Sequence, residues 1–263
     1  MSDDAVLYEV TDHVATITFN RPDSQNTISG PMLNALTERL LEADADVDVR
    51  AIIITGAGKF FCAGLDLRGS DITENLSENK SSPANLDLRN TPPTVLHNLD
   101  TPTIAALNGS AAGYGMDLAL GCDIRIMSED AKLAAAFTAR GVVPESGGTW
   151  ILPRLIGWSR ASEIIFTGKT LTAAECKDMG LVSRTANNNE VYAEARQTAK
   201  EIATNAPLAV QASKRMMRMS MNETFNDHVH HVFLQLLPLF QSEDFKEGMA
   251  SFMERRPPDF KGR

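Results

Sequence analysis

Short apolar runs alternate with polar segments in the first half of the chain. Three runs rich in β-branched residues predict strands: VLYEV (6–10), HVATITF (13–19) and VRAIIITG (49–56). Only two residues separate the first two runs, which predicts a hairpin. Residues 32–44 predict a helix, with Ser29 as its N-cap and Pro31 early in its first turn. The order strand, helix, strand predicts a right-handed parallel crossover.

The rest of the chain moves from strands to helices. Further strands are predicted at 101–109, 123–128 and 132–136. From Ser146 onward the pattern is mostly helical, over residues 147–157, 159–168, 172–180, 190–205, 208–221, 224–240 and 244–256. Glycines at 157, 168 and 180 end three of these segments, as helix C-caps commonly do. Residues 69–93 are rich in Ser, Asn and Pro and predict a long mobile loop beside a site.

Composition narrows the classes of protein. With 263 residues and 43% hydrophobic content, the chain allows one large α/β domain or two small ones. No apolar run reaches the roughly 20 residues that span a bilayer, and MSDDAVLYEV lacks the basic and apolar regions of a secretory signal. Cys62, Cys122 and Cys176 are scattered and odd in number, which favours reduced thiols in a cytoplasm. We therefore expect a cytoplasmic protein with no membrane partner.

Charge argues against a nucleic-acid partner. The net charge of −9 repels polyanions. The C-terminal stretch RRPPDFKGR is locally basic, with four cations and one acid, and on its own reads as a solvated tail.

Three turns rich in small residues follow predicted strands. They are AGKFFCAGLDL, SAAGYGMDLAL and ARGVVPESGGTW. Glycine lets a ligand approach the backbone, and a helix that begins just afterwards offers unpaired N–H groups to an anion. Two such turns can aim two N–H donors at one oxygen. The spacings match neither a P-loop, nor a Rossmann fingerprint, nor a G-x-S-x-G elbow. The residues alone therefore predict an α/β enzyme with backbone anion holes.

Six segments together resemble the enoyl-CoA hydratase/isomerase (crotonase) family over essentially the whole chain. They are NRPDSQNTIS, FFCAGLDL, NGSAAGYGMDLALGCDIRI, GVVPESGGTWILPRLIG, GLVSR and DFKEGMASFMERRPPDFKGR. The resemblance implies an α/β fold: a spiral of repeated β-β-α units over residues 1–200, then a C-terminal helical region over 201–263, in one continuous unit. It also implies assembly into a homotrimer or a dimer of trimers. Acyl-CoA thioesters are the implied substrates; CoA enters as part of the substrate, with no separate cofactor and no metal.

The resemblance also assigns binding residues. The backbone N–H groups of Ala63 and Tyr114 are the implied oxyanion hole, where a thioester enolate gains its negative charge. CoA contacts are implied for Gln25, Cys62, Ala63, Gly64, Leu65, Asp66 and Leu67. Phe260 and Lys261 also resemble CoA-contacting residues, within one chain or towards a neighbouring subunit, and a frayed terminus explains them equally well.

The acidic residues depart from the family pattern. Family hydratases resemble one another in using two glutamates around one water. Asp117 occupies the first of these positions and Phe137 the second, and a phenyl ring cannot deprotonate water. Glu145, in the turn PESGG, resembles the acid of family members that shift a double bond. An acid that begins a helix can instead simply complement the helix dipole, and this applies to Glu145 and Asp117 alike.

The favoured function is isomerisation of an enoyl-CoA, with Glu145 as the base and Asp117 as a second acid or water-positioning group. One alternative is an enoyl-CoA hydratase in which Asp117 and Glu145 hold a water. Another is a CoA-binding scaffold without catalysis. His228 and His231 share a helix face, but without a further ligand we expect a polar or interface face there rather than zinc.

Overall fold

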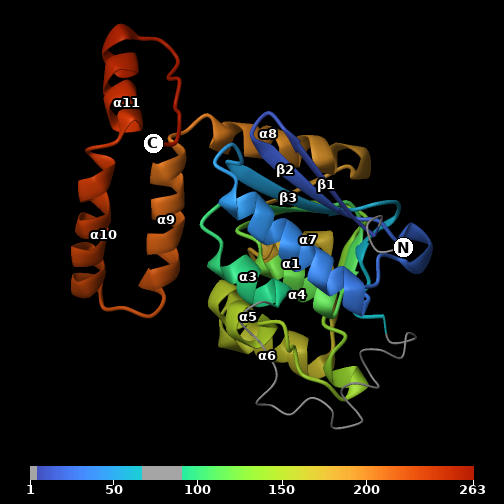
Figure 1. The fold of residues 1–263 in the computed structure, drawn as a ribbon. Coiled ribbons are helices and arrows are strands. Elements are labelled where there is room, and N and C mark those ends of the chain that lie inside the picture. The colour runs from blue at the N-terminus through green and yellow to red at the C-terminus, as the bar shows by residue number, and fades with distance from the viewer. Residues whose placement is uncertain (1–4, 67–90) are drawn as a thin grey trace.

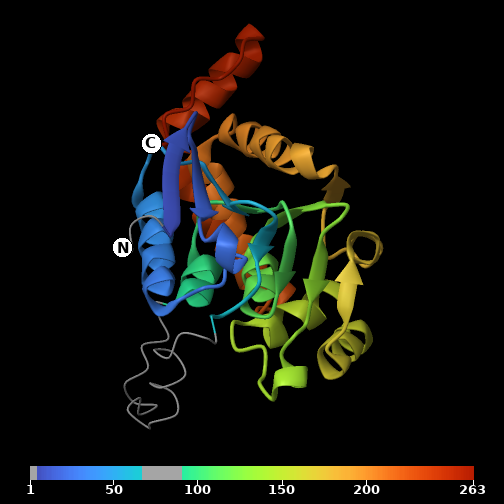
Figure 2. The same cartoon turned by 90° about the vertical axis from the view of Figure 1, so that its right-hand side faces the viewer.

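A computed structural model describes residues 5–66 and 91–263 as a body of sheets and helices with a helical tail (Figures 1 and 2). Most of the loop predicted at 69–93 therefore lies outside the described residues, and so does Leu67. Within the described chain, two sheets form the body.

The larger sheet has the strand order β1-β2-β3-β5-β7-β10. Its strands are β1 (Val6–Thr11), β2 (Val14–Phe19), β3 (Ala51–Gly56), β5 (Thr103–Leu107), β7 (Ile124–Ser128) and β10 (Arg184–Ala186). β1 and β2 pair antiparallel, so the predicted hairpin is confirmed. β3 pairs parallel with β2, as the strand–helix–strand pattern predicts.

Both faces of this sheet are buried, and successive side chains of a strand point to opposite faces. Helix α8 (Val191–Ala203) covers one face, where Val191, Ala195 and Ala199 pack against Ile53 and its neighbours. The adjacent residues Ile52 and Ile54 belong to the main core on the other face. The continuous apolar run AIIITG therefore reflects a strand that is buried on both sides.

The smaller sheet contains β4 (Phe60–Cys62), β6 (Ser110–Ala112), β8 (Lys132–Ala134) and β9 (Thr170–Thr172), in that order. Its first three strands each follow directly on a strand of the larger sheet. β5, β6 and helix α4 (Tyr114–Gly121) form one strand–strand–helix unit, and β1, β2 and α1 (Gly30–Ala45) form another. The predicted α/β fold of repeated β-β-α units is confirmed.

Most helices of the body begin and end where the sequence predicts. Besides α1, α4 and α8, the body contains the helices α3 (Pro92–Asn98), α5 (Gly148–Ile156), α6 (Trp158–Thr167) and α7 (Ala173–Asp178). It also contains the short 3-10 helices η1 (Pro22–Ser24), η4 (Thr138–Arg140) and η5 (Asn188–Glu190). Ser29 occupies the N-cap position of α1, but its side chain makes no capping hydrogen bond. Helix α3 was not predicted. Prolines at its first two positions suit a helix start, where no N–H is needed.

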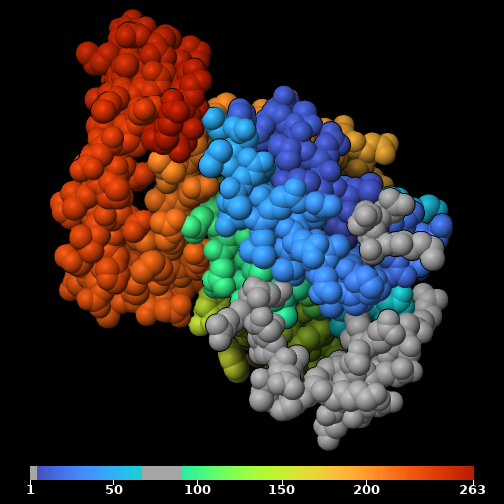
Figure 3. Space-filling model, viewed as in Figure 1, coloured from blue at the N-terminus to red at the C-terminus, as the bar shows by residue number. Residues whose placement is uncertain are grey.

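The tail consists of α9 (Pro207–Ser220), α10 (Phe225–Leu239) and α11 (Glu243–Glu254). It stands beside the body as a separate column in the space-filling view (Figure 3). Helix α10 packs against α9 and contains no buried residue. Nowhere in the part of the chain that the structure describes is a helix both long enough and apolar enough to cross a bilayer.

Candidate functional site

Two turns that are distant in the sequence meet where β4 and β6 end. Glycines permit this approach. A Cβ at Gly64 would lie 2.9 Å from the carbonyl oxygen of Ala112 and 3.7 Å from the amide nitrogen of Tyr114. A Cβ at Gly115 would lie 2.2 Å from the carbonyl oxygen of Cys62, which is too close for any larger residue. The turn after β4 therefore touches the start of α4, as the paired-turn prediction requires.

The Tyr114 amide is available at this junction. Tyr114 is the first residue of α4, so its N–H has no partner within the helix. No other described residue accepts a hydrogen bond from it. Burial, followed by the charge of Glu145, raises the pKa of the Tyr114 phenol, so the side chain stays neutral.

The Ala63 amide is not available, so the prediction for this residue is wrong. Its N–H donates to the carbonyl oxygen of Gln25 at 3.1 Å. Gln25 has a left-handed backbone conformation (φ 54°) that ends the short helix η1. The exposed Gln25 thus contacts the turn through its backbone, and this contact occupies the donor that the enolate would need.

Leu65, two residues further on, offers its N–H instead. It forms a parallel bridge with Ile28, but the bonds of that bridge use its neighbours: Ile28 N–H donates to Gly64, and Asp66 N–H donates to Ile28. In such a bridge the bridged residue's own N–H points away from the partner strand. Gly64, the residue before Leu65, approaches the turn that contains Tyr114, and within the described residues the Leu65 N–H has no hydrogen-bond partner.

The remaining predicted CoA residues of this region lie around the same turn. The Asp66 carboxylate accepts a hydrogen bond from Arg21 at 3.0 Å. Cys62 is fully buried, and this burial raises the pKa of its thiol to about 12, so it carries no charge. Asn26, whose role the sequence pattern does not predict, anchors the loop by donating to the carbonyls of Ala57 (2.9 Å) and Phe60 (2.7 Å).

Asp117 lies one turn along α4 from Tyr114 and is only 2% exposed. Its Oδ2 accepts a hydrogen bond from the Gly148 N–H at 3.2 Å, and the Ser146 backbone N–H also bonds to the carboxylate. Burial raises the pKa of Asp117 to about 7; the negative charge of Glu145 adds to the rise, and the two N–H bonds oppose it. A carboxyl of this kind exchanges its proton near neutral pH.

Glu145 and Phe137 are the two remaining predicted residues near Asp117 and the start of α4. Glu145 is exposed, in the turn before α5, and acts electrostatically on both Asp117 and Tyr114. Phe137 is 3% exposed, and its ring lies 4.0 Å from where a Cβ of Gly113 would be. The second glutamate position is therefore occupied by a buried apolar ring directly beside the start of α4.

Sequence reasoning missed two further residues of this site, Ser146 and Gly148. A Cβ at Gly148 would lie 2.2 Å from Oδ1 of Asp117, so only glycine lets the carboxyl reach this backbone. The signal was present in the sequence as the run of small residues in PESGG, directly after the predicted base.

Within one chain, the tail does not bring Phe260 and Lys261 to these turns. Arg50 donates to the Phe260 carbonyl at 2.7 Å, and the Lys261 N–H donates to Asp244 at 2.6 Å. The C-terminus thus folds back on α11 (Figure 1). Arg256, Lys261 and Arg263 of the stretch RRPPDFKGR form local ion pairs, for example Arg263 with Glu243 at 2.8 Å.

The imidazoles of His228 and His231 both face Glu223, which lies at 3.3 Å from the first and 3.0 Å from the second. Among the described residues, no group of three or more His, Cys, Asp or Glu side chains is placed to hold a metal ion.

Comparison with known proteins agrees with this geometry. The family model for enoyl-CoA hydratase/isomerase matches residues 9–263. The 2,3-dehydroadipyl-CoA hydratase of Escherichia coli (strain K12) is 33% identical, over 95% of this chain and 96% of that protein. The enoyl-CoA hydratase EchA19 of Mycobacterium tuberculosis is also 33% identical, over 98% of this chain and 96% of its own length.

Solved structures have the same fold. The enoyl-CoA hydratase of Bacillus anthracis superposes with a TM-score of 0.89 at 32% identity, covering 98% of this chain and 100% of that one. The described fold, with its parallel sheets, β-β-α units and C-terminal helices, is therefore the crotonase fold. From the residues of the two turns to the full length of the alignment, the observations agree that this chain is an enzyme of the enoyl-CoA hydratase/isomerase family.

Proposed function

We propose that the protein shifts the double bond of an enoyl-CoA thioester, with Glu145 as the base. Glu145 takes a proton from C2 and returns it at C4, and the dienolate between these steps carries its charge on the thioester oxygen. The proposal rests on the burial of three residues. Glu145 is exposed and Asp117 is buried, while the buried Phe137 fills the position of the second glutamate. One exposed carboxylate can move a proton between two carbons, whereas Phe137 cannot activate a water.

The proposed oxyanion hole consists of the N–H groups of Leu65 and Tyr114. Both amides lie at the junction of the two turns, and neither is used by another described residue. Backbone donors fixed in this way stabilise an enolate without reorganising, and one such donor is typically worth about 3 kcal/mol of transition-state stabilisation. Cys62, Ala63, Gly64, Leu65 and Asp66 of the same turn remain proposed CoA contacts, together with Gln25 at the end of η1.

The test compares two substrates and one variant. With a 3-enoyl-CoA, the wild-type protein should produce the 2-enoyl isomer, and Glu145→Gln should lower kcat by about 100-fold or more. Glu163→Gln, on the exposed surface of α6, is the matched control and should leave kcat unchanged. Near-normal turnover by Glu145→Gln would rule out Glu145 as the base.

Hydration is the second candidate. The observation that favours it is the Asp117 carboxyl, whose raised pKa of about 7 lets it hold a proton beside Glu145 at neutral pH. A water held by these two acids would add across the double bond. Rapid hydration of crotonyl-CoA without isomerisation of a 3-enoyl-CoA selects this candidate. Tight acyl-CoA binding with neither reaction selects the non-catalytic scaffold.

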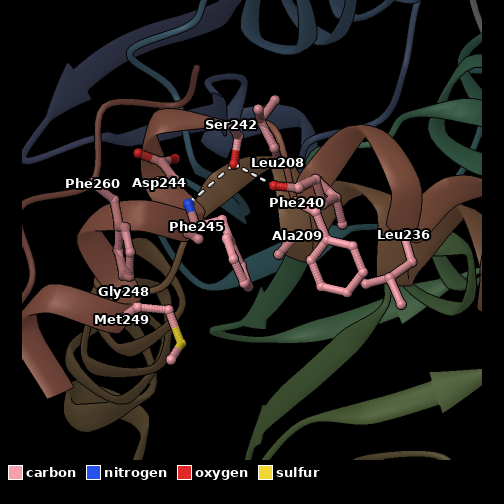
Figure 4. A pocket seen from close by; sticks show the side chains of 12 residues that line it. Leu208, Ala209, Leu236, Phe240, Ser242, Asp244, Phe245, Gly248, Met249 and Phe260 are labelled. Atoms are coloured by element: carbon pink, nitrogen blue, oxygen red, sulfur yellow. Dashed lines mark hydrogen bonds between the residues drawn. The ribbon is translucent and has the colours of Figure 1, made fainter. Parts of the chain in front are cut away.

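We further propose that the tail assembles the protein as a homotrimer or a dimer of trimers. Helix α10 lacks buried residues, yet it carries many exposed apolar side chains: Phe225, Val229, Val232, Phe233, Leu234, Leu236 and Leu237. An apolar pocket of about 310 Å³ lies between α9, α10 and α11, with Phe240, Phe245 and Phe260 among its lining residues (Figure 4). Such surfaces mark protein–protein contacts. Light scattering of the purified protein should give a multiple of three subunits, and a monomer contradicts the proposal.

The remaining expectations accompany this assembly. In it, Phe260 and Lys261 would contact CoA bound to a neighbouring subunit. Residues 1–200 and 201–263 would form one continuous unit, with no cofactor beyond the CoA of the substrate. The three cysteines are free and buried, which supports a reducing, cytoplasmic location.

A further inference from the structure

Ser146 carries a buried polar group that nothing so far explains. The residue is 4% exposed, and its Oγ is buried without a hydrogen-bond partner among the described residues. A buried hydroxyl left unpaired costs about 1–3 kcal/mol. Native proteins give almost all buried polar groups a hydrogen-bond partner, so an unpaired hydroxyl next to the proposed active site suggests a function for that hydroxyl.

Among the described residues, the Asp117 carboxyl lacks the kind of hydrogen-bond partner that a Ser146 hydroxyl can provide. Its oxygens accept hydrogen bonds from the N–H groups of Gly148 and Ser146. Burial raises the pKa of Asp117 to about 7, so the protonated carboxyl is a populated form near neutral pH. A protonated carboxyl is also an O–H donor. Both of these partners are N–H donors, so neither can accept the proton of the carboxyl.

We propose that Ser146 is a positioning residue whose hydroxyl accepts the hydrogen bond of protonated Asp117, directly after rotation of its side chain or through one buried water. Ser146 lies two residues before Gly148, whose N–H donates to Oδ2 of Asp117 at 3.2 Å, and its own backbone N–H acts on the same carboxyl, so the unpaired Oγ belongs to the segment that contacts Asp117. Gly148 keeps the carboxyl against this backbone, since a Cβ there would lie 2.2 Å from Oδ1. One residue thereby serves the carboxyl twice, as a donor to its oxygens and as an acceptor for its proton.

The groups around Asp117 show why holding this proton matters. On its own helix lies Tyr114, and on β4 lies Cys62, both kept neutral by burial. The helices packed against α4 carry two further cationic or titratable side chains, His97 of α3 and Arg154 of α5. Both contact the Trp150 ring: His97 meets it edge-on, and Arg154 lies over it at 3.9 Å from the ring centroid. Within the described chain, the charge that acts on Asp117 is therefore that of Glu145.

This role rests on the proposed function, in which Glu145 is an anion when it removes the substrate proton. A second anion at Asp117 would repel both Glu145 and the developing enolate, so the neutral carboxyl is the competent form. We expect kcat/KM to fall as pH rises through the pKa of Asp117. By stabilising the protonated form, the Ser146 hydroxyl extends activity to higher pH.

The experiment measures the Asp117 proton directly. Difference infrared spectroscopy follows the C=O stretch of the protonated carboxyl as a function of pH, and loss of this band in Asp117→Asn assigns it. Ser146→Ala should move the titration down by about one pH unit, because one hydrogen bond to the protonated form is lost. Ser146→Thr keeps a hydroxyl and should titrate close to wild type. If Ser146→Ala does not fold, Ser146→Cys, a weaker hydrogen-bonding group of similar size, replaces it and should also move the titration down.

The kinetic arm separates this inference from the proposed function. In Ser146→Ala, the alkaline limb of kcat/KM for a 3-enoyl-CoA should move down by the same amount as the infrared titration. An infrared shift in a protein that does not isomerise its substrate overturns the isomerase proposal and keeps the role of Ser146. An unchanged infrared titration in Ser146→Ala, or an equal shift in Ser146→Thr, overturns the role of Ser146 even in an active isomerase.

Discussion

The body and the tail of the molecule use apolar residues in opposite ways. In the body, Phe19 and Phe61 are fully buried and meet edge to face, with ring centroids 5.5 Å apart. In the tail, Phe233 of α10 is 55% exposed and Phe252 of α11 is 78% exposed. The sequence does not distinguish these phenylalanines by type. What differs is whether the fold of one chain can cover them.

The two regions also differ in how they are held. The body is held by apolar packing on both faces of its larger sheet. Helix α9 contributes both buried residues, Pro207, Ala212 and Met216, and charged contacts to the body: Lys214 contacts Asp123 at 2.7 Å, and Arg215 and Arg218 contact Asp100. The body therefore folds around its own core, whereas the tail makes charged contacts through α9 and leaves apolar side chains of α10 and α11 exposed.

The same substitution in both regions tests this comparison with the largest expected effect. Phe61→Ala should lower the free energy of unfolding by about 3–5 kcal/mol, because it leaves a cavity in a packed core. Phe233→Ala should change the unfolding free energy of the isolated subunit by less than about 0.5 kcal/mol but weaken assembly. Chemical denaturation measures the first effect and light scattering at falling protein concentration the second. Equal losses of unfolding free energy would mean that the tail is part of the core.

A second prediction concerns the buried charge at the site. The pKa of Asp117 is raised from 3.8 to about 7, so the folded protein binds this proton more tightly than the unfolded chain does. The associated stability is complete below about pH 4 and is lost as pH rises through about 7, on the order of 4 kcal/mol in total. Asp117→Asn removes this dependence. It should unfold at higher denaturant concentration than wild type near pH 8, and the advantage should shrink towards pH 4. A loss of stability at every pH would contradict the raised pKa.

Much of the fold was predictable because its signals are local. The β1–β2 hairpin, helix α1 and the glycine-ended helices α5 and α6 follow from patterns of a few neighbouring residues. The short strands of the smaller sheet were not predicted as a sheet, since three residues hold too little periodicity. Helix α3 was hidden by its position directly after a polar stretch.

At the site, residue types were predictable but hydrogen-bond directions were not. The acids Asp117 and Glu145 and the turn of Tyr114 could be found from their sequence context. Whether Ala63 or Leu65 has the available N–H depends on which side of the turn faces residues 25–28, a tertiary contact that lies 35–40 positions away along the chain. A family pattern alone does not show that the Gln25 carbonyl has already taken the Ala63 donor.

The smallest expected effect tests the polar attachment of the tail. Burial alone would raise the pKa of Asp100, but its bonds to Arg215 and Arg218 outweigh burial and hold the pKa below its usual value. Asp100→Asn should therefore destabilise by about 1 kcal/mol, the scale of a partly exposed charged network, in the direction opposite to Asp117→Asn. Asp12→Asn is the matched control: Asp12 also meets two cations, Arg196 and Lys200, but at 58% exposure, so its loss should be smaller still. Hydrogen exchange should locate the Asp100→Asn effect in α9 and spare β2 and β3. Faster exchange throughout the sheet would instead show that these ion pairs support the body as a whole.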